Sequence, residues 1–209
     1  IVSNTASVNV LEQPIINPIE TVQNYCIDDV SKSLEVTYSG ATGVEVTYQW
    51  FSNTTNSTAD GNPLADETTN SYNPPTNAVG TMYYYVEIYF SRGDCATLIS
   101  NSASVIVNEI PVIANATITI NSDETFIFNP NSVSGNTTPN NTLYTWVTPS
   151  FNPTDAIVGA SEASTPQQLI SQTLENTTSS PIKVTYLITP ATVDCTGNSF
   201  TLEVTVLAS

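Results

Sequence analysis

The sequence predicts an all-β protein that contains two antiparallel β-sandwiches in tandem, each of about seven strands. Three observations lead to this fold class. Segments rich in Val, Ile, Tyr and Thr recur at short intervals and are separated by Pro, Gly and Asn. These separators also interrupt every segment that could form an amphipathic helix. One stretch of seventeen residues occurs twice, about one domain length apart.

The repeated stretch divides the chain. Residues Ile1–Asn17 align with Leu98–Ala114 at an offset of 97, and nine of the seventeen positions are identical. An interval of that size is one domain long rather than one solenoid turn long. In each copy, alternating apolar residues lead into a Glu-x-Pro step, which is typical of a last strand followed by a short linker. We therefore expect residues 1–11 to be the terminal strand of a preceding, truncated domain, with complete domains at 12–109 and 110–209.

In the first complete domain, alternating apolar residues define two long strands and the direction in which each faces. Trp50 lies on the inner face of the first strand, and Ile88 lies on the inner face of the second. The predicted strands are 33–38, 44–51, 71–73, 82–90 and 96–107, with a turn at 26–29. The predicted core residues are Val44, Val46, Tyr48, Trp50, Met82, Tyr84, Val86, Ile88 and Phe90.

The second domain repeats this plan with small changes in loop length. Trp146 corresponds to Trp50, and the Trp-to-Cys intervals are 45 and 49 residues in the two domains. Two antiparallel sheets packed face to face are the economical arrangement for such short strands. The predicted strands are 116–120, 125–128, 143–148, 168–173, 182–189 and 200–207.

The charge balance excludes several classes of partner. The chain has three Lys and Arg residues against 19 Asp and Glu residues, which gives a formal net charge of −16. Nucleic acids and anionic membrane surfaces require clustered Lys and Arg, so neither is an expected partner. A run of about 18 apolar residues, the signature of a membrane span, is absent from the sequence, and we expect no direct membrane insertion.

The lack of histidine restricts catalysis. Without histidine the chain cannot form a Ser-His-Asp or Cys-His arrangement or a His-ligated zinc site. Paired carboxylates can cleave glycosides, but the acidic pairs of this chain fall in polar turns, where solvated charge is the ordinary explanation. We expect that the protein is not an enzyme.

Short motifs in both domains resemble a known class of proteins. Tyr25-Cys26, Tyr48-Gln49-Trp50, Tyr84-Tyr85-Val86 and Gly93-Asp94-Cys95 are similar to Ig-like modules repeated in large secreted proteins of gliding and marine Bacteroidetes. In the second domain, Tyr144-Thr145-Trp146 and segments 170–178, 184–190 and 195–198 resemble the PKD-like repeats of the same proteins. The resemblance covers nearly all of residues 13–208 and is closest to the giant gliding-motility adhesins.

This resemblance implies tandem Ig-like/PKD-like antiparallel β-sandwiches that serve as a stalk or adhesive surface. It also implies export by the type IX secretion system. The expected location is extracellular, at the cell surface, with the outer-membrane attachment supplied by other parts of the parent protein.

The three cysteines offer one disulfide within a domain. An exported protein can keep a disulfide, and Cys26 and Cys95 belong to the same predicted domain. Closing their 69-residue interval would stabilise the fold by roughly 4 kcal/mol, provided that their Cα atoms come within bonding range. We predict the disulfide Cys26–Cys95 and a buried free thiol at Cys195.

A row of aromatic residues is the candidate contact surface. If the core residues of strand 82–90 face inward, then Tyr83, Tyr85 and Tyr89 face outward, beside Phe51 on the adjacent strand. Exposed tyrosines in a row suit stacking on sugar rings or contact with another protein surface. The alternative is that Tyr is simply a good strand former whose ring covers the sheet.

Calcium is the candidate metal for the acidic turns. Asp28 with Asp29, and Asp123 with Glu124, could contribute to the six to eight oxygen ligands that Ca²⁺ prefers. An Asp-x-Asp-x-Asp spacing is absent, so hydrated acidic turns are preferred and no other cofactor is expected. The Asn-x-Ser/Thr sequons, among them Asn53, Asn136 and Asn176, match the richness of the chain in Asn and Thr and are given no role.

The leading hypothesis is a non-enzymatic repeat segment of an exported bacterial adhesin for gliding or surface attachment. Its partners would be neighbouring repeats of the same chain, with a polysaccharide or a surface protein as a further ligand. The alternative is a carbohydrate-binding or spacer module of a secreted polysaccharide-degrading enzyme. A third hypothesis is a self-assembling surface protein, in which residues 1–11 complete the sheet of a neighbour.

Overall fold

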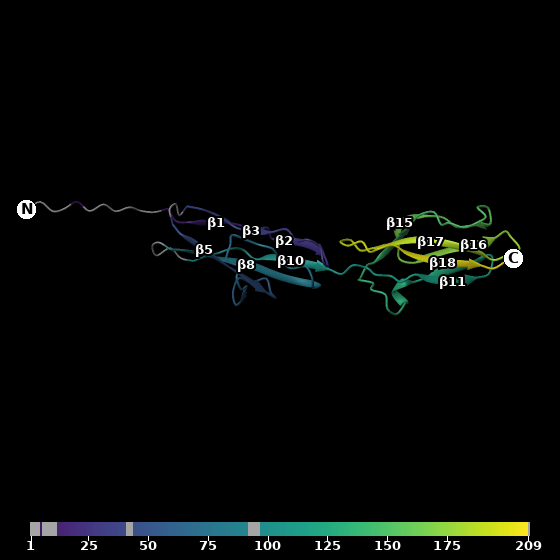
Figure 1. Ribbon diagram of the computed structural model, residues 1–209, viewed down its shortest axis with the longest axis horizontal. Helices are drawn as coiled ribbons and strands as arrows, with labels where there is room; N and C mark the ends of the chain where they lie inside the picture. The colour runs from purple at the N-terminus through teal and green to yellow at the C-terminus, as the bar shows by residue number, and fades with distance from the viewer. Residues whose placement is uncertain (1–4, 6–11, 41–43, 92–96, 209) are drawn as a thin grey trace, which may run out of the picture. The chain divides into compact units, whose positions relative to one another are not determined.

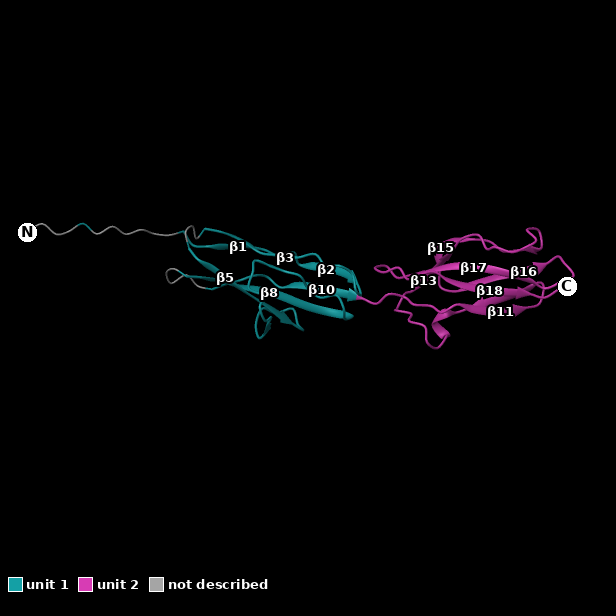
Figure 2. Ribbon diagram, in the orientation of Figure 1, with its two compact units in different colours: residues 1–107 teal, residues 108–209 magenta. Residues whose placement is uncertain are grey.

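A computed structural model describes residues 5, 12–40, 44–91 and 97–208 of the chain. The chain divides into two compact units, Ile1–Val107 and Asn108–Ser209 (Figure 2). The predicted boundary stood two residues further on, between 109 and 110. The predicted terminal strand at 1–11 lies, apart from Thr5, outside the described residues.

Unit 1 is built on one large sheet and two small ones (Figure 1). The large sheet has six strands in the order β2-β10-β8-β5-β6, with β9 paired to β8. The small sheets are β1-β4 and β3-β7. The strands are β1 (Ile15–Asn17), β2 (Val22–Cys26), β3 (Leu34–Glu35), β4 (Thr37–Ser39), β5 (Val46–Asn53), β6 (Asn62–Pro63), β7 (Ser71–Tyr72), β8 (Gly80–Phe90), β9 (Leu98–Ile99) and β10 (Ala103–Asn108).

Trp50 is the centre of the unit 1 core. Its side chain is fully buried, and its indole nitrogen donates a hydrogen bond of 2.9 Å to the carbonyl oxygen of Thr69. Tyr72 of β7 packs on the indole ring, and Leu34 of β3 is buried in the same cluster. Since Trp50 belongs to the large sheet and its neighbours belong to a small one, these contacts hold the two layers together.

The predicted inner face of β8 is correct at four positions, which are Tyr84, Val86, Ile88 and Phe90. The prediction for Met82 is wrong because its side chain is 37% exposed. Met82 lines a hollow of about 160 Å³ near the start of β8, together with Tyr84 and Val105. Alternation assigned Met82 to the correct face, but this part of the face is open.

Unit 2 has a five-stranded sheet in the order β11-β18-β17-β13-β15 and a three-stranded sheet in the order β12-β16-β14. One short 3-10 helix, η1 (Pro130–Ser132), follows β12. The strands are β11 (Ala116–Ile120), β12 (Glu124–Phe128), β13 (Leu143–Trp146), β14 (Ile157–Val158), β15 (Ala163–Gln167), β16 (Ile170–Asn176), β17 (Ile182–Ala191) and β18 (Phe200–Val206).

The long strands of unit 2 alternate between core and surface. In β18, Phe200, Leu202, Val204 and Val206 are buried, while the residues between them are partly exposed. Residues of β12 and β16 from the smaller sheet, Phe126 and Leu174 among them, enter the same core. Both units are therefore β-sandwiches, and the predicted all-β fold class is confirmed.

The first and last strands of unit 2 lie side by side and run parallel. Ala116 of β11 is opposite Leu202 of β18, and Ile120 is opposite Val206. The chain therefore enters unit 2 at one end of this strand pair and leaves at the other end. The other pairings within the five-stranded sheet are antiparallel.

Candidate functional site

The predicted aromatic row lies on the outer face of β5 and β8, but it is not a row of exposed rings. Phe51 is opposite Tyr85 in the strand register, and the two rings stack with centroids 5.0 Å apart and planes 4° apart. Tyr85 is only 2% exposed, so the prediction that it faces solvent is wrong. Gly61 covers it so closely that a Cβ there would lie 2.6 Å from the Tyr85 hydroxyl oxygen.

Tyr89 is the most accessible member of the predicted row, and 39% of it is exposed. Its hydroxyl donates a hydrogen bond to the Glu87 carboxylate. This bond, with some burial, raises the pKa of Tyr89 to about 12. Phe51 and Tyr83 are half-buried. A ligand-contact role for Phe51, Tyr83 and Tyr89 stays a prediction.

Both cysteine predictions are contradicted by the disulfides of the structure. Cys195 is buried and disulfide-bonded, so the predicted free thiol is wrong. Cys26, at the end of β2, is also disulfide-bonded. Cys95 lies outside the described residues. Because the chain has three cysteines, disulfides at both Cys26 and Cys195 are incompatible with a bond between Cys26 and Cys95, so that predicted pairing is wrong. Non-reducing peptide mapping checks this, since a peptide that links Cys26 to Cys95 would contradict it.

The two acidic pairs form turns of the same construction. In the first, Asp28 has a left-handed backbone with φ of 65°, and the Asp29 carboxylate accepts a 2.8 Å bond from the Cys26 N–H. In the second, Asp123 also has φ of 65°, and the Glu124 carboxylate accepts a 2.8 Å bond from the Asn121 N–H. In each pair one carboxylate therefore closes its own turn, and a calcium role stays a prediction.

Across the described ranges, no three His, Cys, Asp or Glu side chains gather in a way that could hold a metal ion. No helix in the same part of the chain is long and apolar enough to cross a bilayer.

Two of the sequons are hydrogen-bonded turns that sequence reasoning passed over. Asn53 is 9% exposed and Asn176 is fully buried. In each turn the Asn amide oxygen accepts bonds from the backbone N–H and the hydroxyl of the Thr two residues later. The shared pattern Asn-Thr-Thr-x-Ser, at 53–57 and 176–180, was the signal available in the sequence.

The Asn176 turn also holds the end of β18. Its amide nitrogen donates to the carbonyl oxygens of Ser180 at 2.9 Å, Val206 at 3.0 Å and Leu207 at 3.3 Å. Asn176 ends β16, and Val206 ends β18, so this one side chain joins the two sheets of unit 2.

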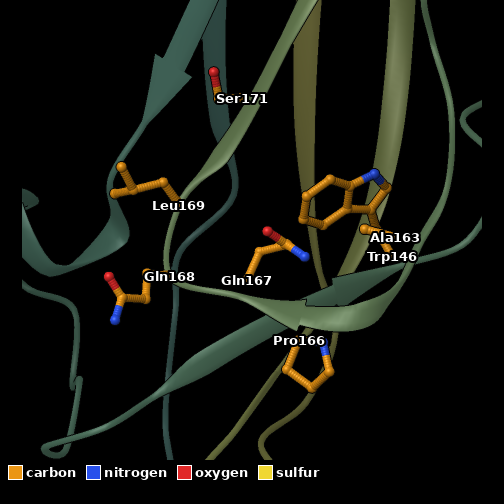
Figure 3. A pocket seen from close by; sticks show the side chains of 7 residues that line it. All are labelled: Trp146, Ala163, Pro166, Gln167, Gln168, Leu169 and Ser171. Atoms are coloured by element: carbon orange, nitrogen blue, oxygen red, sulfur yellow. The ribbon is translucent and has the colours of Figure 1, made fainter.

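A hollow of unit 2 lies where the chain passes from β15 to β16, and it has a volume of about 530 Å³. Trp146, Pro166 and Leu169 contribute apolar surface, while Gln167 and Gln168 contribute amides. Figure 3 shows the Gln167 amide directed toward Trp146, with Gln168 and Leu169 on the other side of the backbone. No pattern in the sequence predicts this hollow.

Family models match each unit separately. Residues 119–209 match a family described as a PKD-like domain. Residues 17–109 match a family described as a domain of unknown function. The fold is a tandem of two β-sandwiches, the second of which is similar to PKD-like domains. No curated protein matches the chain.

The solved structures that are similar to this chain belong to several multidomain proteins. A three-Ig segment of titin is 10% identical with a TM-score of 0.46, covering 94% of this chain and 66% of that chain. Three N-terminal domains of the bacteriophage RB49 outer capsid protein Hoc are 12% identical with a TM-score of 0.40, covering 94% and 70%. The human desmocollin-1 ectodomain is 9% identical with a TM-score of 0.44, covering 94% and 42%. The chain thus spans less than two thirds of the titin and desmocollin chains.

Proposed function

We propose that this chain is a stalk segment of an exported bacterial cell-surface adhesin, related to the gliding-motility adhesin SprB. Its role is mechanical and non-enzymatic. Tandem sandwiches hold an adhesive end away from the cell and transmit tension along their strands. Neighbouring repeats of the same chain are its direct partners, and the cell surface of a gliding member of the Bacteroidetes that uses type IX secretion is its location.

The observation that carries this proposal is the parallel pairing of β11 with β18. These are the first and last strands of unit 2, and five residue pairs join them, from Ala116–Leu202 to Ile120–Val206. Tension applied to the two ends of the unit pulls these strands past each other along their length. The hydrogen bonds between them are then loaded together, whereas an unzipping geometry loads them one after another.

The linker before β11 gives further support. Val112 and Thr137 exchange backbone hydrogen bonds of 2.9 and 2.8 Å, and the Ala114 N–H donates to the Asn136 amide oxygen at 3.0 Å. The Pro111 carbonyl packs so closely on Gly197 that a Cβ there would lie 2.1 Å from its oxygen. Residues from Pro111 onward are thus fixed to unit 2, and only Glu109 and Ile110 follow β10 before that fixed segment. A linker this short suits a stalk.

A carbohydrate-binding or spacer module of a secreted polysaccharide-degrading enzyme is the second candidate. The observation that favours it is the uncharged hollow beside Trp146. The full sequence of the parent protein separates the two candidates, because an adhesin contains many further repeats and a degrading enzyme contains a catalytic domain with paired acids.

Single-molecule pulling tests the mechanical role on the whole chain in two geometries. With handles at residues 109 and 208, β11 and β18 are sheared. With handles at Lys183 and Thr205, which are opposite each other in the β17–β18 register, the hairpin is unzipped. We expect a clearly higher unfolding force in the first geometry. Equal forces, or a lower force in the first geometry, would refute the proposal.

A further inference from the structure

A second hollow adjoins the hollow beside Trp146. The second hollow has a volume of about 450 Å³ and shares Gln168 and Leu169 with the first, whose volume is about 530 Å³. Each volume falls in the range of about 300–1,000 Å³ that is usual for ligand sites. Gln168 and Leu169 line both hollows, so this step of the chain lies between them.

The lining of both hollows is uncharged. The first offers the amides of Gln167 and Gln168 and the hydroxyl of Ser171. The second offers further amides, from Asn129, Asn131 and Asn141. Among the described residues the amide of Gln168 makes no hydrogen bond, and that of Gln167 donates only to the nearby Thr165 carbonyl at 2.9 Å. Neutral donors and acceptors beside apolar surface suit a ligand with many hydroxyl groups and no charge.

We propose that these two hollows form one binding track for an uncharged polysaccharide. Sugar hydroxyls exchange hydrogen bonds with the amides of both hollows, and the apolar faces of sugar rings lie on the exposed side chains of Leu169 and Pro166. The track is on unit 2, away from the aromatic row that the sequence suggested on unit 1. It does not depend on the stalk function, since a binding module would use it equally well.

An extended peptide is the competing occupant, because β15 is the last strand of the order β11-β18-β17-β13-β15 and an edge strand can pair with another chain. Two features of β15 oppose such pairing. Pro166 has no backbone N–H to donate. The β13–β15 register also shifts between Tyr144 and Trp146, which interrupts a regular ladder. An acidic polysaccharide is disfavoured by the net charge of −16.

Native affinity electrophoresis of the whole chain tests the proposal. The strong negative charge of the chain gives the protein high mobility in a gel, so that binding to an embedded polymer shows as retardation. Gels are cast with a neutral β-glucan, galactan, xylan or mannan, with alginate as an acidic polysaccharide, or with gelatin as an extended polypeptide. The test variant is the double substitution Gln167→Ala and Gln168→Ala, whose positions are both exposed. The matched control is Gln13→Ala, an exposed glutamine on unit 1.

We expect at least one neutral polysaccharide to retard the chain. The double variant should raise the dissociation constant about tenfold or more, as the loss of two hydrogen-bonding amides implies. Gln13→Ala should leave it unchanged, and thermal unfolding should show that all three proteins are folded. Retardation by gelatin or alginate alone, by none of the polymers, or equally in the double variant would overturn the proposal.

Discussion

Replacing Asn176 with alanine should destabilise unit 2 selectively. The side chain is fully buried, donates to three carbonyl oxygens and accepts two bonds from Thr178. Each buried hydrogen bond contributes about 1 kcal/mol net. After the substitution, the hydrogen-bonding groups near Ser180 can bond to water instead, so not every lost bond counts in full. The expected loss is therefore about 3 kcal/mol of the free energy of unfolding. For a domain of about 100 residues this lowers the melting temperature by about 12–24 °C.

Differential scanning calorimetry provides the assay, with Asn53→Ala as the matched variant. Asn53 makes the same kind of turn in unit 1, but its amide nitrogen donates only to carbonyls of its own loop, Ser57 and Ala59. We expect Asn53→Ala to cost about 1–2 kcal/mol and to move the transition of unit 1. Asn176→Ala should move the transition of unit 2 and leave that of unit 1 in place.

The reasoning is refuted if Asn176→Ala costs less than about 1 kcal/mol, or if it costs no more than Asn53→Ala. Either result would mean that water satisfies the hydrogen-bonding partners of Asn176 as well as its side-chain amide does. Movement of both transitions by one substitution would instead show that the two units do not unfold independently, which calorimetry on the unchanged chain detects beforehand.

Three further predictions concern backbone strain, pH and calcium. Gly135 and Gly159 have nearly the same positive φ, 91° and 92°, but a Cβ meets nothing within 4 Å at Gly135 and lies 2.1 Å from the Thr173 carbonyl oxygen at Gly159. Gly135→Ala should therefore lower the free energy of unfolding by about 1–2 kcal/mol, and Gly159→Ala should lower it clearly more. Urea unfolding measures both losses, and equal losses would contradict the close contact at Gly159. Burial raises the pKa of Tyr144 to about 12 and also raises the pKa of Tyr186, so the unfolded chain ionises first as the pH rises above 10. The stability contributed by the neutral tyrosines is complete below pH 10. Between pH 10 and about pH 12 the free energy of unfolding should fall by up to about 1.4 kcal/mol per pH unit for each tyrosine. An unchanged melting temperature over that range would contradict this prediction. Millimolar Ca²⁺ should move the melting temperature by less than about 1 °C relative to EDTA, because the carboxylates of Asp29 and Glu124 already accept hydrogen bonds from backbone N–H groups. A rise of several degrees would show that the acidic turns bind the ion.

The strands that could be predicted are those whose alternation reports one buried face. β11 has the predicted bounds, and β17 and β18 begin at the predicted residues, because Val, Ile and Phe alternate there with polar residues. Trp50 and Trp146 were matched correctly, and each indole donates a hydrogen bond to a backbone carbonyl oxygen, at Thr69 and Ser161 respectively.

The strands that were missed lack this signal. The inward residue of β2 is Gln23, which is 6% exposed and contacts Glu20 and Tyr25 by hydrogen bonds, so no apolar alternation marks the strand. β15 contains Pro166 and mostly exposed residues, and nothing in its composition is typical of a strand.

The candidate site was harder to predict than the fold. Alternation correctly places Tyr85 opposite Phe51 on the outer face of its sheet, but it cannot show that a loop folds over that face. The contact from Gly61 comes from 24 residues earlier in the chain, and the absence of a side chain there is what permits it. The hollow beside Trp146 likewise depends on the course of the chain between two sheets, which no local pattern encodes.

The hydrogen-bonded sequons affect the choice of host for producing this chain. A eukaryotic secretory pathway attaches its glycans to the amide nitrogen of Asn in such sequons. In the folded chain these nitrogens are already used, by Asn176 toward the end of β18, by Asn53 toward its loop and by Asn136 toward the Pro130 carbonyl. A glycan added before folding would remove donors from the interior and place a large polar group where Asn176 is fully buried. Protein made in yeast or animal cells should therefore misfold at sites that a bacterial host leaves unmodified.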